Sequence, residues 1–190
     1  MNKLIFIALA GLALPSLQGC ATAFIGGAAA GTAVALDRRT AGVFVGDQEI
    51  ELRAAHRLTE AFPQKNVSIA ATSFNRQVLL TGQAPDEASR ARASEIVKAV
   101  PDVRTVFNEL AISGITSLTS SGNDASLTAQ VKTRLLRDER VPGTKIKVKT
   151  ESGIVYLMGL VTQSEADVAT EITSMTAGVT KVVKLFEIIN

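Results

Sequence analysis

Cys20 is the residue whose surroundings indicate covalent chemistry most clearly. It ends the run LQGC at 17–20, and it follows a positively charged start and an apolar stretch over 4–14. This order is typical of a bacterial lipoprotein signal, in which a peptidase cuts before the cysteine and the thiol carries a diacylglyceryl group. We therefore predict a signal peptide at 1–19 and a lipid anchor at Cys20.

The alternative is an ordinary secretory signal followed by a buried or disulfide-bonded cysteine. Cys20 is the only cysteine in the chain, so it has no partner for an intrachain disulfide. One acyl chain binds a membrane reversibly, whereas the several chains implied by this signal, palmitate among them, make release negligible. Ala21 rather than an aspartate follows the cysteine, which favours the periplasmic face of the outer membrane. Residues 20–45 are expected to form a flexible Gly/Ala tether.

Catalytic and metal-binding constellations are not visible in the sequence. His56 is the only histidine, so a metal cluster or a histidine-based triad lacks its second member. It is expected on the outward side of a helix, where a solvated histidine is the ordinary outcome. With a net charge of +2 and no tryptophan, the chain has neither the basic field nor the stacking surfaces typical of nucleic-acid binding. We predict no enzyme activity, no cofactor, no metal site and no nucleic-acid partner.

An internal repeat organises the rest of the chain. An offset of 77 residues superimposes VLLTG at 78–82 on VYLMG at 155–159, and an offset of 76 aligns VRTV at 103–106 with VTKV at 179–182. Apolar periodicity in each copy predicts the order helix, strand, strand, helix, strand. This order allows a three-stranded sheet with both helices on one face, which is an α+β sandwich of two layers.

Local signals mark where these elements begin and turn. Asp47 and Asp124 precede the apolar stripe of the first helix in each copy, so we predict that they are N-caps. Asn75-Arg76 and Ser152-Gly153 separate two apolar strands and predict hairpin turns.

These boundaries give a first domain at 46–112, a linker at 113–122 and a second domain at 123–190. Each domain has about 67 residues and no disulfide, so it is only marginally able to bury its own core. We therefore expect contact between the copies. Tyr156 and Met158 are candidates for this contact because they project from the opposite sheet face to Val155 and Leu157; exposure to solvent is the alternative.

The residues of the repeat resemble a known family. The pattern G-x-V-x-L-x-G at 153–159, followed by a helix and by GVTKV at 178–182, resembles the BON domain. Two such copies behind a lipobox, with VRTVFNE at 103–109, are similar to the dual-BON outer-membrane lipoproteins called division- and outer-membrane-stress-associated lipid-binding proteins. Arg76 departs from the pattern, because it stands at the turn position that Gly153 fills in the second copy.

This resemblance implies binding of anionic phospholipid through the first helix of the second domain, and the charge pattern agrees with it. Residues 46–60 carry four carboxylates and two arginines, whereas residues 123–137 carry three basic side chains and Asp124 alone. The candidate phospholipid-binding residues are Ser126, Lys132, Thr133, Leu136 and Arg137. Ser126 stands where a larger membrane-inserting side chain would be expected, which predicts shallow insertion. A basic helix that is merely solvated is the alternative.

The sequence thus predicts a non-enzymatic outer-membrane lipoprotein, composed of two tandem BON domains, that binds phosphatidylglycerol or cardiolipin surfaces. Such a protein would support envelope integrity and act at division sites. The alternative is a protein-binding adaptor for outer-membrane β-barrel assembly or for cell-wall enzymes, with the sheet faces as its contact surface.

Overall fold

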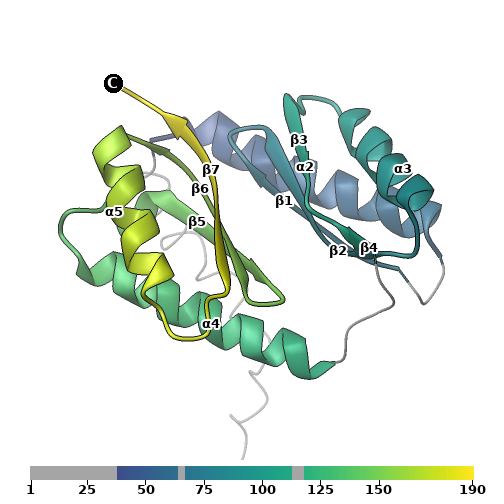
Figure 1. Ribbon diagram of the computed structural model, residues 1–190. Coiled ribbons are helices and arrows are strands. Elements are labelled where there is room, and N and C mark those ends of the chain that lie inside the picture. Colours follow the sequence, from purple (N-terminus) through teal and green to yellow (C-terminus); the bar gives the residue numbers. More distant parts are fainter. Residues whose placement is uncertain (1–37, 64–66, 113–117) are drawn as a thin grey trace, which may run out of the picture. The chain divides into compact units, whose positions relative to one another are not determined.

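The computed structural model describes residues 38–63, 67–112 and 118–190 (Figure 1). The predicted signal peptide, Cys20 and most of the predicted tether lie outside the described residues. The first copy consists of α2 (Ala41–Ala61), β1 (Ser68–Phe74), β2 (Gln77–Ala84), α3 (Glu87–Lys98), β3 (Thr105–Asn108) and β4 (Ala111–Ile112). The second copy consists of α4 (Leu118–Arg137), the short 3-10 helix η1 (Gly143–Lys145), β5 (Ile146–Glu151), β6 (Ile154–Val161), α5 (Gln163–Ser174) and β7 (Lys181–Ile188).

Each copy has the predicted α+β topology. In the first copy, β2 is the central strand: it pairs with β1 in antiparallel and with β3 in parallel orientation, and the short β4 continues along its far end. In the second copy, β6 pairs in the same way with β5 and β7. The parallel pair is possible because α3 or α5 provides the crossover connection that parallel strands require.

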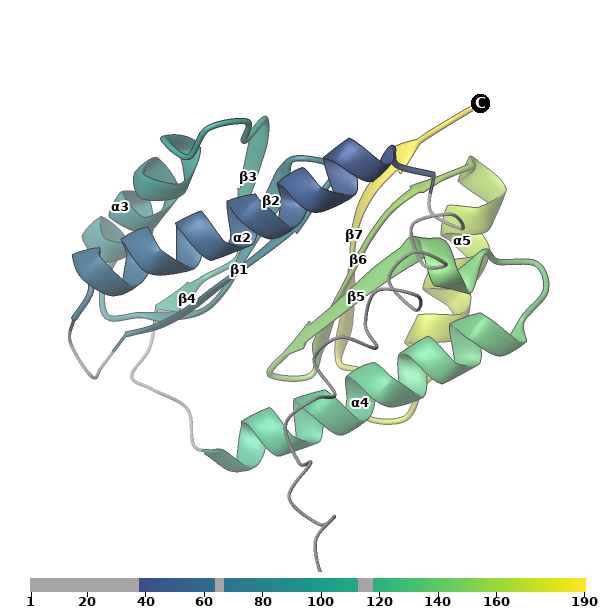
Figure 2. The same cartoon turned by 180° about the vertical axis from the view of Figure 1, so that it is seen from behind.

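Both helices of each copy cover the same sheet face, as Figure 2 shows for α2 and α4 from behind. The buried stripe of α2 packs with the inward side chains of β2 and α3, and α4 packs in the same manner with β6 and α5. These stripes are Ile50, Ala54 and Leu58 in α2, and Leu127, Val131 and Leu135 in α4, all at most 3% exposed. The predicted core is therefore confirmed.

The prediction that Asp47 and Asp124 are helix N-caps is wrong. α2 begins at Ala41, where the hydroxyl of Thr40 provides the cap, and α4 begins at Leu118. Both aspartates therefore lie inside their helices, and both are buried. The two helices also extend into the segments that the sequence predicted as tether and linker.

The two aspartates cap the hairpin turns instead. Asp47 accepts hydrogen bonds from the backbone N–H groups of Asn75 and Arg76, at 2.7 and 2.8 Å. Asp124 accepts in the same way from the two N–H groups of the turn 152–153, at 2.7 and 2.9 Å. Each carboxylate thus ties the first helix of its copy to the tip of the adjacent hairpin.

The turn of the first copy keeps the geometry of the second, although Arg76 replaces glycine there. Arg76 has φ +65° and Gly153 has φ +77°. A left-handed conformation costs a residue with a side chain about 1 kcal/mol or more. The two hydrogen bonds to Asp47 offset this cost, so the departure from the repeat pattern changes the sequence but not the fold.

The outer sheet faces form a third apolar cluster that combines side chains of both copies. Tyr156 and Met158 lie in it beside Phe74 and Leu79, with Leu185 at its edge. Tyr156 is 2% exposed and Met158 1% exposed. The expected contact between the copies is therefore present, and solvent exposure of these two side chains is ruled out.

Candidate functional site

The outward face of α4 is where the sequence placed its candidate binding residues, and three contacts fix this helix on its domain. Its inward stripe is buried against the sheet. Asp124 ties its N-terminal half to the β5–β6 turn. At the other end, the chain returns so closely at Gly143 that a Cβ there would lie 2.5 Å from the Leu135 carbonyl oxygen. The orientation of the outward face is thus set by packing on the opposite side.

All five predicted residues lie on this exposed face. They are Ser126, Lys132, Thr133, Leu136 and Arg137. Leu136 is the large apolar member, and it is 59% exposed. The face therefore presents one aliphatic side chain between basic ones, because Lys132 and Arg137, five residues apart, lie about 140° apart around the helix with Leu136 between them.

The polar side chains of this face differ in whether they already have a hydrogen-bond or ion-pair partner. The Thr133 hydroxyl donates to the Ala129 carbonyl of its own helix at 2.8 Å, and Ser126 accepts from Gln130 at 3.4 Å. Lys132 and Arg137 make no ion pair or hydrogen bond with the other residues that the structure describes. These two cations are therefore available to an external anion, whereas the two hydroxyls are partly satisfied.

Arg140 and Met175 lie next to this face and were not among the predicted residues. They line a groove with Arg134 and Arg137 where α4 and α5 end. Met175 is the C-cap residue of α5 and is 67% exposed. One signal in the sequence could have identified it, because the repeat aligns Met175 with the small Ala99 of the first copy.

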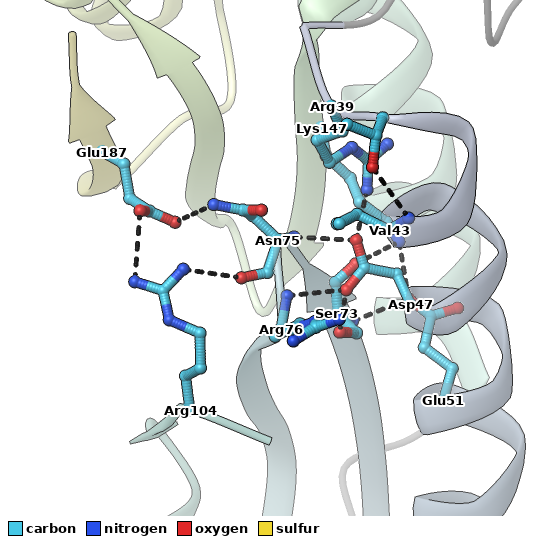
Figure 3. Close-up of polar contacts among 11 residues, drawn as sticks. Arg39, Val43, Asp47, Glu51, Ser73, Asn75, Arg76, Arg104, Lys147 and Glu187 are labelled. Carbon is cyan, nitrogen blue, oxygen red and sulfur yellow. Dashed lines mark hydrogen bonds and ion pairs between the residues drawn. The ribbon is translucent and has the colours of Figure 1, made fainter. Parts of the chain in front are cut away.

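A second polar cluster surrounds Asp47 in the first copy (Figure 3). Besides the two turn amides, Asp47 accepts from Arg39 at 2.6 Å and from the Ser73 hydroxyl at 2.7 Å. The Arg39 guanidinium also stacks on Phe74, 3.9 Å from the ring centroid. The side chains of Asp47 and Arg39 are 0% and 7% exposed. This buried pair is saturated with internal partners, which is typical of a structural role.

Polar contacts extend from this cluster to the second copy. The Asn75 side-chain amide donates to Glu187 at 2.7 Å, and Arg104 approaches the same carboxylate at 3.6 Å (Figure 3). Lys147 donates to the Ser73 carbonyl at 2.9 Å. These contacts surround the shared apolar cluster with satisfied polar groups.

Arg38 joins the start of the described chain to the second copy. Its guanidinium donates to both carboxylate oxygens of Glu165 at 2.7 Å and to the Leu160 carbonyl at 2.8 Å. Arg38 lowers the pKa of Glu165 to about 2, and the Thr162 N–H contributes in the same direction. The segment just before α2 is therefore bound to the first turn of α5 through Arg38 and Glu165.

None of these clusters has the composition of a catalytic or metal centre. His56 is exposed, 3.3 Å from Glu60 on the same helix, which confirms its solvated position. Within the described segments, no group of three or more His, Cys, Asp or Glu side chains could ligate a metal. Among the same residues, no helix combines the length and apolar composition needed to cross a bilayer.

Comparisons with known proteins agree with the repeat and its fold. The BON domain model matches residues 46–114 and again 123–190. The chain belongs to the BON-domain family and contains two BON domains in tandem. It is 40% identical over 90% of its length to "Outer membrane lipoprotein DolP" of Haemophilus influenzae, 89% of which is covered.

Two further relatives are similar along most of the chain. A "21 kDa hemolysin" of Actinobacillus pleuropneumoniae is 32% identical over 79% of this chain and 78% of its own. The "Osmotically-inducible protein Y" of Escherichia coli is 28% identical over 80% of this chain and 78% of its own. Their names describe different contexts, so they do not point to one shared function.

Proposed function

We propose that this outer-membrane lipoprotein binds anionic phospholipid surfaces through the outward face of α4 in its second BON domain. The observation that supports this function best is the combination of an exposed Leu136 with two cations, Lys132 and Arg137, that have no ion-pair partner among the described residues, on one helix face. The cations attract the anionic headgroups, and the aliphatic side chain enters the interface between headgroups and acyl chains.

The attraction between this face and an anionic membrane is too weak to hold the protein there without a lipid anchor. A basic residue near an anionic surface contributes about 1 kcal/mol, so Lys132, Arg134 and Arg137 together give about 3 kcal/mol, which is weak alone. An acyl anchor at Cys20 would raise the local concentration of membrane to the millimolar range. Weak attraction then suffices to orient the second domain on the bilayer.

The first BON domain is not expected to bind in this way. Its equivalent helix α2 carries Glu49 and Glu60 on its exposed surface, and its exposed Arg53 is paired with Glu49 within the helix. Position 137 of the second domain corresponds to Glu60 of the first. An anionic surface would therefore repel α2 where it attracts α4.

The adaptor hypothesis has less support in this arrangement. It relied on the sheet faces as contact surfaces, but Leu79, Tyr156 and Met158 on those faces are at most 2% exposed. They are already covered by the other copy. A contribution to envelope integrity or to division is compatible with the phospholipid-binding function and forms part of this proposal.

The test is vesicle binding by the mature chain carrying Cys20→Ser, which removes the anchor and leaves α4 unchanged. Binding to phosphatidylglycerol vesicles but not to phosphatidylcholine vesicles is expected, and it should weaken with salt as the Debye length falls from about 10 Å at 0.1 M to about 3 Å at 1 M. Leu136→Asp should weaken it at every salt concentration. Equal binding to both vesicle types would reject the proposal.

A further inference from the structure

A groove lies beside the proposed membrane surface, between the C-terminal ends of α4 and α5. Its volume is about 360 Å³, which is in the range of small-ligand sites. Three arginines, two carboxylates and two apolar side chains line it: Arg134, Arg137, Arg140, Asp138, Glu171, Ile172 and Met175. A groove with this lining can hold an anionic group that also carries an apolar part.

The three arginines are held to different degrees. Arg140 donates to Asp138 from Nε at 2.9 Å and from Nη2 at 2.7 Å, which fixes the plane of its guanidinium. Arg134 reaches the Met175 carbonyl at 3.5 Å. Arg137 makes no contact of this kind with the rest of the described chain. Two guanidiniums are thus positioned by the protein, and the third is free to close on a ligand.

The first BON domain has the same groove with different chemistry. It has a volume of about 390 Å³ and is lined by Arg57, Glu60, Ala61, Ile96 and Ala99. Arg57 donates to the Ala99 carbonyl at 2.7 Å, as Arg134 does to Met175. The groove therefore follows from the fold, and only its lining differs: in the second domain Glu60 is replaced by Arg137, and Ala99 by Met175.

The apolar residues of the second groove are placed for an acyl chain. Met175, which lines the groove, is 67% exposed, and the partly buried Ile172 lines it as well. A phosphate in the groove would thus have one exposed apolar side chain, Met175, beside it. Inorganic phosphate gains nothing from this apolar contact, whereas the acyl region of a glycerophospholipid can pack against it.

We propose that this groove binds the phosphate of a single anionic glycerophospholipid, held by Arg137 and Arg140, with Met175 against its acyl region. Arg134 also lines the groove. Planar guanidiniums suit this task, because each can donate two parallel hydrogen bonds to phosphate oxygens, which an ammonium group cannot do. The inference rests on the proposed function and deepens it: the second domain would recognise one lipid molecule in addition to sensing surface charge.

The test uses the mature chain with Cys20→Ser and dihexanoyl phosphatidylglycerol below its micelle concentration. Saturable shifts of the Arg137 and Arg140 Nε–Hε resonances are expected. Arg137→Lys with Arg140→Lys keeps the charge but removes the bidentate geometry, and it should weaken the Kd about tenfold, as expected for one lost charge-assisted hydrogen bond. Met175→Ala, which copies the first domain, should weaken lipid binding while leaving the weaker binding of inorganic phosphate unchanged.

The outcomes separate this inference from the function on which it rests. If the double lysine variant binds the short-chain lipid and phosphatidylglycerol vesicles as the parent does, charge acts diffusely and the groove is not a site, although α4 still binds membranes. If the parent fails to bind phosphatidylglycerol in either form, both proposals fall. Unchanged amide resonances outside the groove are the control for folding in each variant.

Discussion

Replacing Asp47 by alanine tests the structural role that distinguishes this residue from a helix cap. In the wild-type chain its carboxylate accepts four hydrogen bonds, from Arg39, Ser73 and the N–H groups of the turn 75–76. The substitution would remove the Asp47 carboxylate from the guanidinium of Arg39, which is 7% exposed. It would also leave two turn amides without their acceptor.

The expected cost follows from these contacts. Breaking a buried ion pair by removing one partner lowers the free energy of unfolding by about 3–5 kcal/mol. We expect a loss of this size from breaking the Asp47–Arg39 pair. Asp124→Ala is the matched control, because Asp124 accepts only from the two turn amides of the second copy among the contacts that the structure describes. Its loss should cost about 1–3 kcal/mol. The difference between the two variants reports the Arg39 ion pair together with the Ser73 hydrogen bond.

Urea unfolding of the mature chain, followed by circular dichroism, measures the two losses of unfolding free energy. Amide hydrogen exchange supplies the local readout, because a chain with two domains need not unfold in one transition. Faster exchange at Asn75 and Arg76 is expected in Asp47→Ala, with the first turn of α2 unchanged. If instead the amides at the start of α2 lose protection while those of the turn keep it, Asp47 acts as a helix cap and our account of it is wrong.

Three further predictions concern single groups. Burial raises the pKa of Tyr156 to about 12, and since Tyr156 is the only tyrosine, absorbance near 295 nm should report its titration directly; a midpoint near 10 would contradict its burial between the copies. The Arg38–Glu165 pair holds the pKa of Glu165 near 2, below its ordinary 4.5. The pair should therefore stabilise the fold by about 1 kcal/mol after solvent screening at neutral pH, and this stabilisation should disappear as the pH falls from about 4.5 to about 2. Glu165→Gln should lose stability at neutral pH but not at pH 2, and an equal loss at both would refute the assignment. Cys20→Ala should abolish metabolic labelling with fatty acid and release the chain from the membrane fraction, whereas labelling at the parent level would reject Cys20 as the anchor.

Much of the fold could be predicted because the repeat provides two independent readings of each element. The stripes beginning at Ile50 and Leu127 recur at helical spacing, and the apolar strands alternate around turns rich in polar residues or glycine. Asp47 and Asp124 could not be assigned in this way. An acidic residue one turn before an apolar stripe has the same local pattern whether it caps the helix or accepts from a hairpin tip that is distant in sequence.

In the candidate site too, features that follow from local sequence could be predicted, and features that depend on contacts between distant segments could not. The exposed face of α4 follows from the period of its buried stripe, so Lys132, Leu136 and Arg137 could be placed from the sequence. The groove could not, because Met175 and Arg140 line it together only when the end of α5 lies beside the end of α4. The function of this face remains a prediction, and its charge is the property to test.

The most direct measurement is vesicle binding by the variant Lys132→Glu/Arg137→Glu in the mature chain, at low salt and with phosphatidylglycerol vesicles. The matched control is Arg53→Glu/Lys98→Glu, which changes the total charge equally at two exposed positions of the first domain. The α4 variant is expected to lose binding while the control keeps it, both with native circular dichroism. Unchanged binding by the α4 variant, or an equal loss in both, would contradict the claim that this helix is the phospholipid-binding surface.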